Sequence, residues 1–179
     1  MYCDASYANL KGDASQSGYV IFLVDGSGNA NVLKWQSKKI SRVVKSTLAA
    51  ETLALLDAAE TGYYLKRLIE SFLGVNDGTI EVRCFTDNKS IVDHVFKSTN
   101  KVADFRLRVD IACLRDMIRR QEISHIHWID TASQLADCLT KADCSSKNLS
   151  TVLTSNLMSY NIMAKCRLPK YEADGLVSK

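Results

Sequence analysis

The spacing of hydrophobic and polar positions predicts strands in the first part of the chain and a long helix after them. Residues 1–8 read as a strand, and residues 17–40 read as two strands around a Gly/Asn-rich turn at Asp25–Asn31, a strong hairpin signal. Residues 46–73 have a helical pattern, with Ser46 or Thr47 as the expected cap and Gly74 as the stop. The middle of this helix is apolar on nearly all sides, which predicts packing against a sheet.

The second part alternates strands with helices. The pattern predicts strands over 79–87 and 124–130, helices over 88–97 and within 103–121, and a last helical region from 133 to about 157. The first strands suit an antiparallel meander, and the later ones should add as parallel strands. We therefore expect an α/β fold: a five-stranded mixed sheet, its first three strands antiparallel, with helices on both faces. Residues 1–157 form the predicted domain, and residues 158–179 a partly ordered tail.

The composition fits a globular protein with a mild basic excess. Hydrophobic residues make up 46% and charged residues 24% of the chain, and the net charge is +3. This charge permits nucleic-acid binding without arguing for it. The six cysteines show no C-x-x-C spacing, so neither a zinc site nor a disulfide framework is indicated. We expect no signal peptide and no membrane-spanning segment.

Four acidic residues stand out by their position in the predicted elements. Asp4 lies inside the first strand, and Glu51 lies in the apolar stretch LAAETLALL of the long helix. Asp87 ends the fourth strand, and Asp137 lies in the first turns of the predicted last helix. Burying an ionised carboxylate without a partner is costly, so Glu51 in particular requires a neutralising group.

The predicted topology places these acids together. The first and fourth strands would be neighbours, with the long helix crossing behind them, so all four carboxylates would converge at one end of the sheet. Without a Lys or Arg nearby in the sequence they would repel one another unless cations lie between them. Two Mg²⁺ ions about 3.5–4 Å apart would activate a water and stabilise the leaving oxygen of a phosphodiester. Mn²⁺ accepts the same oxygen ligands. Taken singly, each acid also suits an ordinary cap, turn or solvated position.

Several segments resemble, in order, the ribonuclease H domain of copia-type LTR retrotransposon polyproteins. They are DASYA, SQSGYVIFL, LKWQSKKI, STLAAE, FTDNKSIV and DTASQLADCLTK, which together span roughly residues 2–157. QLADCLTK and TDNKS are the most specific of them. The chain departs from the family in having DASYA and LAAE where DADWA and STEAE are usual. It also has no His at 130–133, where cellular ribonucleases H carry one in the loop before the last acid.

The resemblance implies a ribonuclease H-like fold and hydrolysis of the RNA strand of RNA–DNA hybrids with two Mg²⁺ ions. It assigns both catalysis and metal binding to Asp4, Glu51, Asp87 and Asp137, with both ions on Asp4. It also implies a reverse transcriptase domain in the parent polyprotein. The implied location is the cytoplasm, within a virus-like particle, or the nucleus.

Other classes of protein share part of this pattern. Transposases and integrases take their acids from the first strand, the fourth strand and a late helix, so Glu51 argues for ribonuclease H. Acidic-cluster exonucleases carry an Asp-x-Glu pair in the first strand, whereas Asp4 is followed by Ala5 and Ser6. The remaining alternative is a catalytically silent or domesticated module that binds nucleic acid, although all four acids are present.

Polar residues outside the acidic set are candidates for contacting the hybrid: Asn88, Ser90, Lys38, Lys39, Arg108 and Arg115. The first two adjoin Asp87, within reach of a nucleic-acid backbone or 2′-OH, although Asn88 also suits a helix cap. The basic residues suit phosphates, but a solvated helix or sheet face explains them equally well. Trp35 and Trp128 are expected in the core or on a sheet face rather than as platforms for bases.

Overall fold

The computed structural model describes residues 1–97 and 102–158 of the chain. Its strands form one sheet in the order β3-β2-β1-β4-β5, in which β1, β2 and β3 pair antiparallel and β4 runs parallel to both β1 and β5. The five-stranded mixed sheet is therefore confirmed. The strands are β1 (Tyr2–Leu10), β2 (Ala14–Val24), β3 (Ala30–Lys39), β4 (Arg83–Thr86) and β5 (His125–Trp128).

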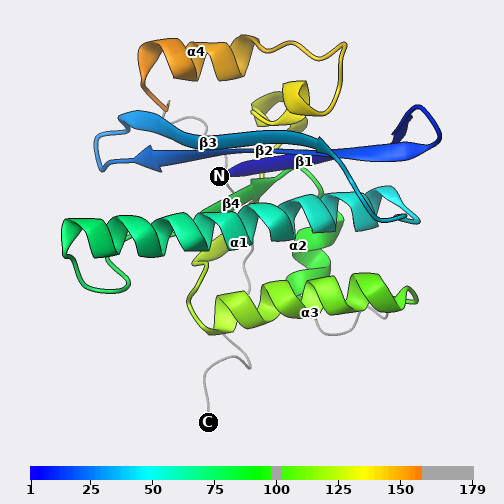
Figure 1. The fold of residues 1–179 in the computed structure, drawn as a ribbon, viewed down its shortest axis with the longest axis horizontal. Coiled ribbons are helices and arrows are strands. Elements are labelled where there is room, and N and C mark those ends of the chain that lie inside the picture. The colour runs from blue at the N-terminus through cyan, green and yellow to red at the C-terminus, as the bar shows by residue number, and fades with distance from the viewer. Residues whose placement is uncertain (98–101, 159–179) are drawn as a thin grey trace.

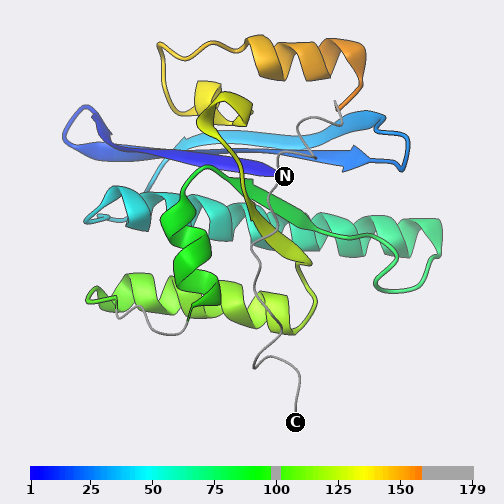
Figure 2. The ribbon, with the colours of Figure 1, turned by 180° about the vertical axis from the view of Figure 1, so that it is seen from behind.

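Helices cover both faces of this sheet, as predicted. Figure 1 and the reverse view in Figure 2 show α1, α2 and α3 on one face and α4 on the other. None of the helices in the described parts of the chain is long and apolar enough to cross a membrane. The helices are α1 (Thr47–Leu73), α2 (Lys89–Phe96), α3 (Phe105–Arg119) and α4 (Lys147–Ser155).

The helix ends follow the local sequence signals. Ser46 caps α1 by accepting a hydrogen bond from the Ala49 amide at 3.1 Å, and Gly74 ends the helix in the left-handed conformation, with φ of 66°. Asn88 caps α2 by accepting from the Ser90 amide at 2.9 Å. These caps fix where α1 and α2 begin, and both beginnings lie close to predicted acids.

Hydrophobic clusters on both faces of the sheet hold the layers together. The core on the α1 side includes Cys3, Leu55 and Ile126, all fully or almost fully buried. On the opposite side the aromatic rings of Tyr2, Phe85 and His127 stack across β1, β4 and β5, with centroid separations of 4.8 and 5.3 Å. This stack fixes the lateral register of the three strands.

Some predictions about the elements are wrong. The chain after β5 does not form one helix from 133 to 157. It makes two short 3-10 turns, η1 (Thr131–Ser133) and η2 (Asp137–Leu139), and α4 begins only at Lys147. The expectation for the tryptophans holds: Trp128 is half-buried, and Trp35 is 64% exposed on the face of the edge strand β3. Of the predicted tail 158–179, only Met158 belongs to the described residues.

Candidate metal centre

The parallel register of β1 and β4 brings Asp4 level with Asp87. Tyr2 pairs with Phe85 in this register, so the residues two positions further along each strand come side by side on the same face. Asp87 follows the last residue of β4 and precedes Asn88, the cap of α2. The convergence of the first and fourth strands thus follows from the predicted strand order.

Asp137 reaches this point because β2 has no side chain opposite Asp4. Gly18 is the antiparallel partner of Asp4, and a Cβ at Gly18 would lie 2.8 Å from Leu139 Cβ and 2.9 Å from Thr140 Cγ2. The η2 turn therefore packs directly on the backbone of β2. The Thr140 hydroxyl donates a hydrogen bond to Asp4 Oδ2, which ties the turn to β1.

Side chains of the sheet hold this turn and explain why it does not continue as a helix. Ser37 and Gln16 donate to the Leu139 carbonyl at 2.6 and 2.9 Å, and Ser6 donates to the Thr140 carbonyl at 2.9 Å. A continuing helix would need these carbonyls for amides four residues later. Sheet contacts replace them, so Asp137 lies in a short turn and not in the predicted helix.

Three of the four predicted acids form a close group. Asp4, Asp87 and Asp137 each offer one carboxylate oxygen, and these oxygens all lie within 4.8 Å of one another. Asp4 is 2% exposed and Asp137 7%, whereas Asp87 is half-buried and also accepts a hydrogen bond from Thr131 at 2.9 Å. In the described part of the chain, this is the group of His, Cys, Asp and Glu side chains that could hold a metal ion.

Glu51 borders this group from the first turns of α1. Its carboxylate lies outside the 4.8 Å set, but burial and the charges of Asp87 and Asp4 raise the pKa of Glu51 to about 8, against the opposing effects of Asn88 and Lys141. Its Oε2 atom is buried and has no hydrogen-bond partner among the described residues. An orphaned buried carboxylate oxygen beside three others has the geometry of an open ligand position.

Lys141 is the cation of this centre, and the sequence-based interpretation missed it. Its Nζ lies 2.6 Å from Asp137 Oδ1 and 3.4 Å from Asp4 Oδ2. It stands four residues after Asp137, the spacing at which opposite charges meet along one helical turn, so the signal was present. The assumption that no Lys or Arg lies nearby in the sequence is therefore wrong.

The electrostatics of the group show crowding that a single ammonium does not relieve. Burial raises the pKa of Asp4 to about 6; Thr140 and Lys141 lower it, and the neighbouring Asp137 and Asp87 raise it further. For Lys141, partial burial opposes the charge, yet the hydrogen bond to Asp137 and the charge of Asp4 hold its pKa above the usual value. The carboxylates outnumber the one amine, and an all-oxygen ligand set suits a hard divalent cation.

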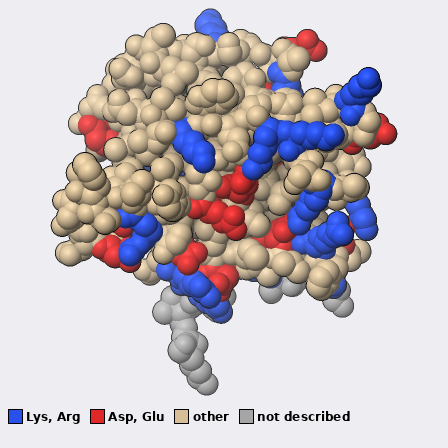
Figure 3. Space-filling view, in the orientation of Figure 1, with Lys and Arg blue, Asp and Glu red and all other residues tan. Residues whose placement is uncertain are grey.

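The candidate nucleic-acid residues differ in the contacts that they make within the fold. On the face shown in Figure 3, Lys and Arg side chains are interspersed with Asp and Glu. Lys38 pairs with Asp57 at 2.9 Å, and Lys39 is exposed at the end of β3. Ser90 is exposed beside Asp87, and Asn88 serves as the cap of α2.

The two arginine candidates differ in how the fold uses them. Arg115 donates hydrogen bonds to the carbonyls of His94, Val95 and Lys97 at 2.6, 2.9 and 3.3 Å, which ties α3 to the end of α2. Arg108 is exposed and lies over the Phe105 ring, 5.6 Å from its centroid. The contacts of Arg115 are those of a structural residue, and Arg108 is the freer of the two.

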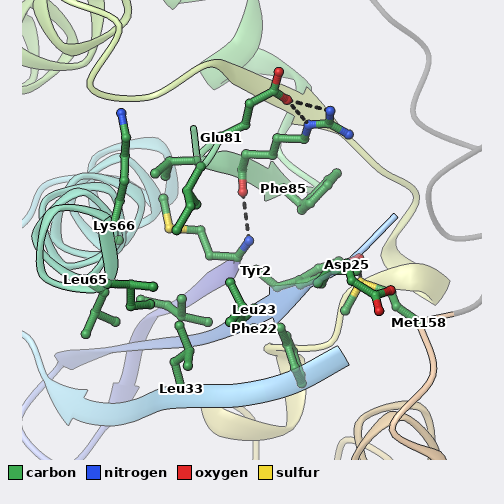
Figure 4. Close-up of a pocket in the computed structure, with 18 of the residues that line it drawn as sticks. Tyr2, Phe22, Leu23, Asp25, Leu33, Leu65, Lys66, Glu81, Phe85 and Met158 are labelled. Carbon is green, nitrogen blue, oxygen red and sulfur yellow. Dashed lines mark hydrogen bonds and ion pairs between the residues drawn. The ribbon is translucent and has the colours of Figure 1, made fainter. Parts of the chain in front are cut away.

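A separate cavity of about 480 Å³ lies beyond the start of β1, away from the acids (Figure 4). Met1 lines this cavity, and its terminal amine donates a hydrogen bond to the Arg83 carbonyl at 2.7 Å. Apolar side chains such as Leu23, Leu33 and Leu65 line much of the wall. None of the four acids lines this cavity, so it is distinct from the carboxylate group.

Comparison with known proteins supports the fold assignment. No protein-family model matches the chain, and no curated protein sequence does. LC11-RNase H1, isolated from compost by a metagenomic approach, matches with a TM-score of 0.53 and 20% identity, over 85% of this chain and 95% of that one. A structure of LC11-RNase H1 in complex with an RNA/DNA hybrid matches with a TM-score of 0.55 and 22% identity, over 83% and 96%. At these identities the likeness shows the fold, which is ribonuclease H-like as predicted.

Proposed function

We propose that the chain is a metal-dependent endoribonuclease that hydrolyses the RNA strand of RNA–DNA hybrids. The convergence of Asp4, Asp87 and Asp137, with the orphaned Glu51 oxygen beside them, is the observation that carries this proposal. The ribonuclease H-like fold supports it, as does the solved complex of LC11-RNase H1 with an RNA/DNA hybrid.

The four acids would act as the ligands of Mg²⁺, two ions in all, or of Mn²⁺. When bound, such ions activate water and stabilise the charge that develops on the leaving 3′ oxygen. Asp4 has a carboxylate oxygen within 4.8 Å of both Asp137 and Asp87 and accepts a hydrogen bond from Thr140, which supports its proposed role as a ligand of both ions. Glu51 would complete the ligand set from the α1 side.

The substrate would be held by residues outside the acidic group. Asn88 follows Asp87 directly and Ser90 comes two residues later, a position that supports contact with the backbone or the 2′-OH of the RNA strand. Lys38, Lys39 and Arg108 would contact phosphates more remotely. Arg115 is a weaker candidate for binding phosphates, because its guanidinium already donates to three backbone carbonyls.

The biological setting is proposed from the copia-type motifs. DASYA, TDNKS and QLADCLTK support a retrotransposon origin, a reverse transcriptase domain in the parent polyprotein, and action during reverse transcription in a cytoplasmic virus-like particle or the nucleus. A catalytically silent module that binds nucleic acid is the competing function.

The test is cleavage of a hybrid with a labelled RNA strand, in Mg²⁺ and in chelator, by the wild type and by Asp87→Asn. Asp93→Asn is the matched control, because Asp93 lies on α2 and pairs with Lys97 outside the acidic group. We expect metal-dependent cutting that Asp87→Asn abolishes and Asp93→Asn retains. If the wild type binds the hybrid with Mg²⁺ present and leaves it intact, the catalytic proposal fails and the silent module is supported.

A further inference from the structure

A cation bound by the acidic group would compete with the Lys141 ammonium for the same carboxylate oxygens. Lys141 Nζ lies within hydrogen-bond distance of Asp137 Oδ1 and 3.4 Å from Asp4 Oδ2, so the ammonium bridges two of the three grouped acids. The two carboxylates are almost fully buried, whereas the lysine side chain is 40% exposed. The ammonium therefore enters the group from the solvent side.

The distances limit what else can bind beside the ammonium. Divalent cations lie 2.0–2.6 Å from carboxylate oxygens, and Lys141 Nζ lies 2.6 Å from Asp137 Oδ1. An ion on that same oxygen would therefore lie within about 5 Å of Nζ. Two positive groups at this separation, screened only partly by solvent, repel each other strongly.

We propose that Lys141 is the internal counter-ion of the acidic group: its ammonium holds Asp137 and Asp4 together without metal, and it must leave for a divalent cation to bind. The inference rests on the proposed function, since it assumes that these acids are metal ligands. Lys141 is thus a positioning residue that sets metal affinity through competition, and it is not itself a ligand.

The side chain is suited to this exchange. A lysine has a flexible stem and a single point charge, so rotation about its side-chain bonds can move the ammonium into solvent without displacing the backbone. The backbone of the turn stays fixed meanwhile, because the amides of Thr140 and Lys141 both donate to the Asp137 carbonyl at 3.0 Å. Metal binding then requires only a side-chain movement.

The test compares Lys141→Met, which keeps the length of the side chain and removes its charge, with Lys141→Arg, which keeps the charge. Lys97→Met is the matched control: Lys97 also pairs with an acid four residues away, Asp93, at 2.9 Å and with similar exposure, but on α2. Melting temperature in chelator and Mg²⁺ affinity by calorimetry are measured for each protein in its full length.

For Lys141→Met we expect the melting temperature in chelator to fall by about 2–4 °C and the Mg²⁺ dissociation constant to fall about tenfold. Lys141→Arg and Lys97→Met should keep the wild-type dissociation constant. An unchanged or higher dissociation constant in Lys141→Met overturns the competition. If the wild type itself binds no Mg²⁺, the proposed function fails too; binding by the wild type with unaltered affinity in Lys141→Met defeats only the inference about Lys141.

Discussion

The η2 turn packs closely on Gly18, so adding one methyl group there, in Gly18→Ala, tests whether this packing positions Asp137. In Gly18→Ala, the new Cβ would stand 2.8 Å from Leu139 Cβ and 2.9 Å from Thr140 Cγ2, where ordinary contact begins at 3.4 Å. The turn must therefore retreat from β2 by about 0.6 Å. Asp137 belongs to that turn, whereas Asp4 lies on β1 and Asp87 follows β4 directly, so the carboxylate group must widen.

The size of the effect follows from these contacts. Overpacking of this kind costs about 1–3 kcal/mol of the free energy of unfolding. A displacement that approaches 1 Å in a catalytic group can lower the rate about hundredfold. We therefore expect Gly18→Ala to bind Mg²⁺ about tenfold more weakly and to cleave the hybrid at least that much more slowly, while remaining folded.

The assay pairs Gly18→Ala with Gly62→Ala. A Cβ at Gly62 would also be crowded, at 2.8 Å from Met1 Sδ, but this neighbour is a flexible side chain and not part of the η2 turn. Urea unfolding, Mg²⁺ calorimetry and hybrid cleavage are measured for both, and Gly62→Ala should keep wild-type metal affinity. If Gly18→Ala binds Mg²⁺ and cuts as the wild type does, the packing of the turn does not position Asp137, and this reasoning is refuted.

Three further predictions concern stability and substrate contact. His127 is buried, and burial lowers its pKa to about 4; the unfolded chain thus binds more protons between pH 6.5 and 4, so stability is lost as the pH falls through this window. The free energy of unfolding of His127→Phe, taken relative to that of the wild type, should therefore be roughly 3 kcal/mol higher at pH 4 than at pH 7.5. His125→Gln is the control and should show no such gain. Glu70 accepts hydrogen bonds from two loop amides at 3.1 and 2.9 Å, so Glu70→Ala should lower the urea-derived free energy of unfolding by about 2 kcal/mol; a change below 0.5 would contradict this. Arg115→Ala should lower the free energy of unfolding by about 1–3 kcal/mol. Arg108→Ala should instead weaken hybrid binding at low salt. If Arg108→Ala lowers stability and Arg115→Ala weakens binding, the roles given to these two residues are wrong.

Local sequence signals and the strand order predict much of the fold, and they predict that Asp4 and Asp87 meet in the site. Ser46, Gly74 and Asn88 act where their chemistry predicts, because a cap depends on neighbours within one turn. The meeting of Asp4 with Asp87 follows from parallel pairing, which fixes residues level with one another along two strands. These predictions needed no knowledge of side-chain packing.

The surroundings of Asp137 could not be read in this way. Its turn is held by Ser6, Gln16 and Ser37, which lie more than 100 residues earlier in the chain and take the carbonyls that a helix would use. The pattern of QLADCLTK is compatible with a helix, and tertiary hydrogen bonds override it. Lys141, by contrast, is predictable from the sequence, because it stands four residues after Asp137, the spacing at which opposite charges meet.

The single register pair between β1 and β4 has a consequence for how the sheet opens. Tyr2 and Phe85 form that pair, and beyond it the cavity at Met1 separates β2 from the approach to β4. The meander β3-β2-β1 forms from contacts close in sequence, whereas this joint closes a loop of more than 80 residues and should form late and open first. Asp4 and Asp87 lie on opposite sides of the joint. A cation bound to both carboxylates would therefore hold β1 and β4 together. The Phe85 amide donates to the Met1 carbonyl at 2.9 Å across this joint, so its hydrogen exchange should become slower when the cation is bound.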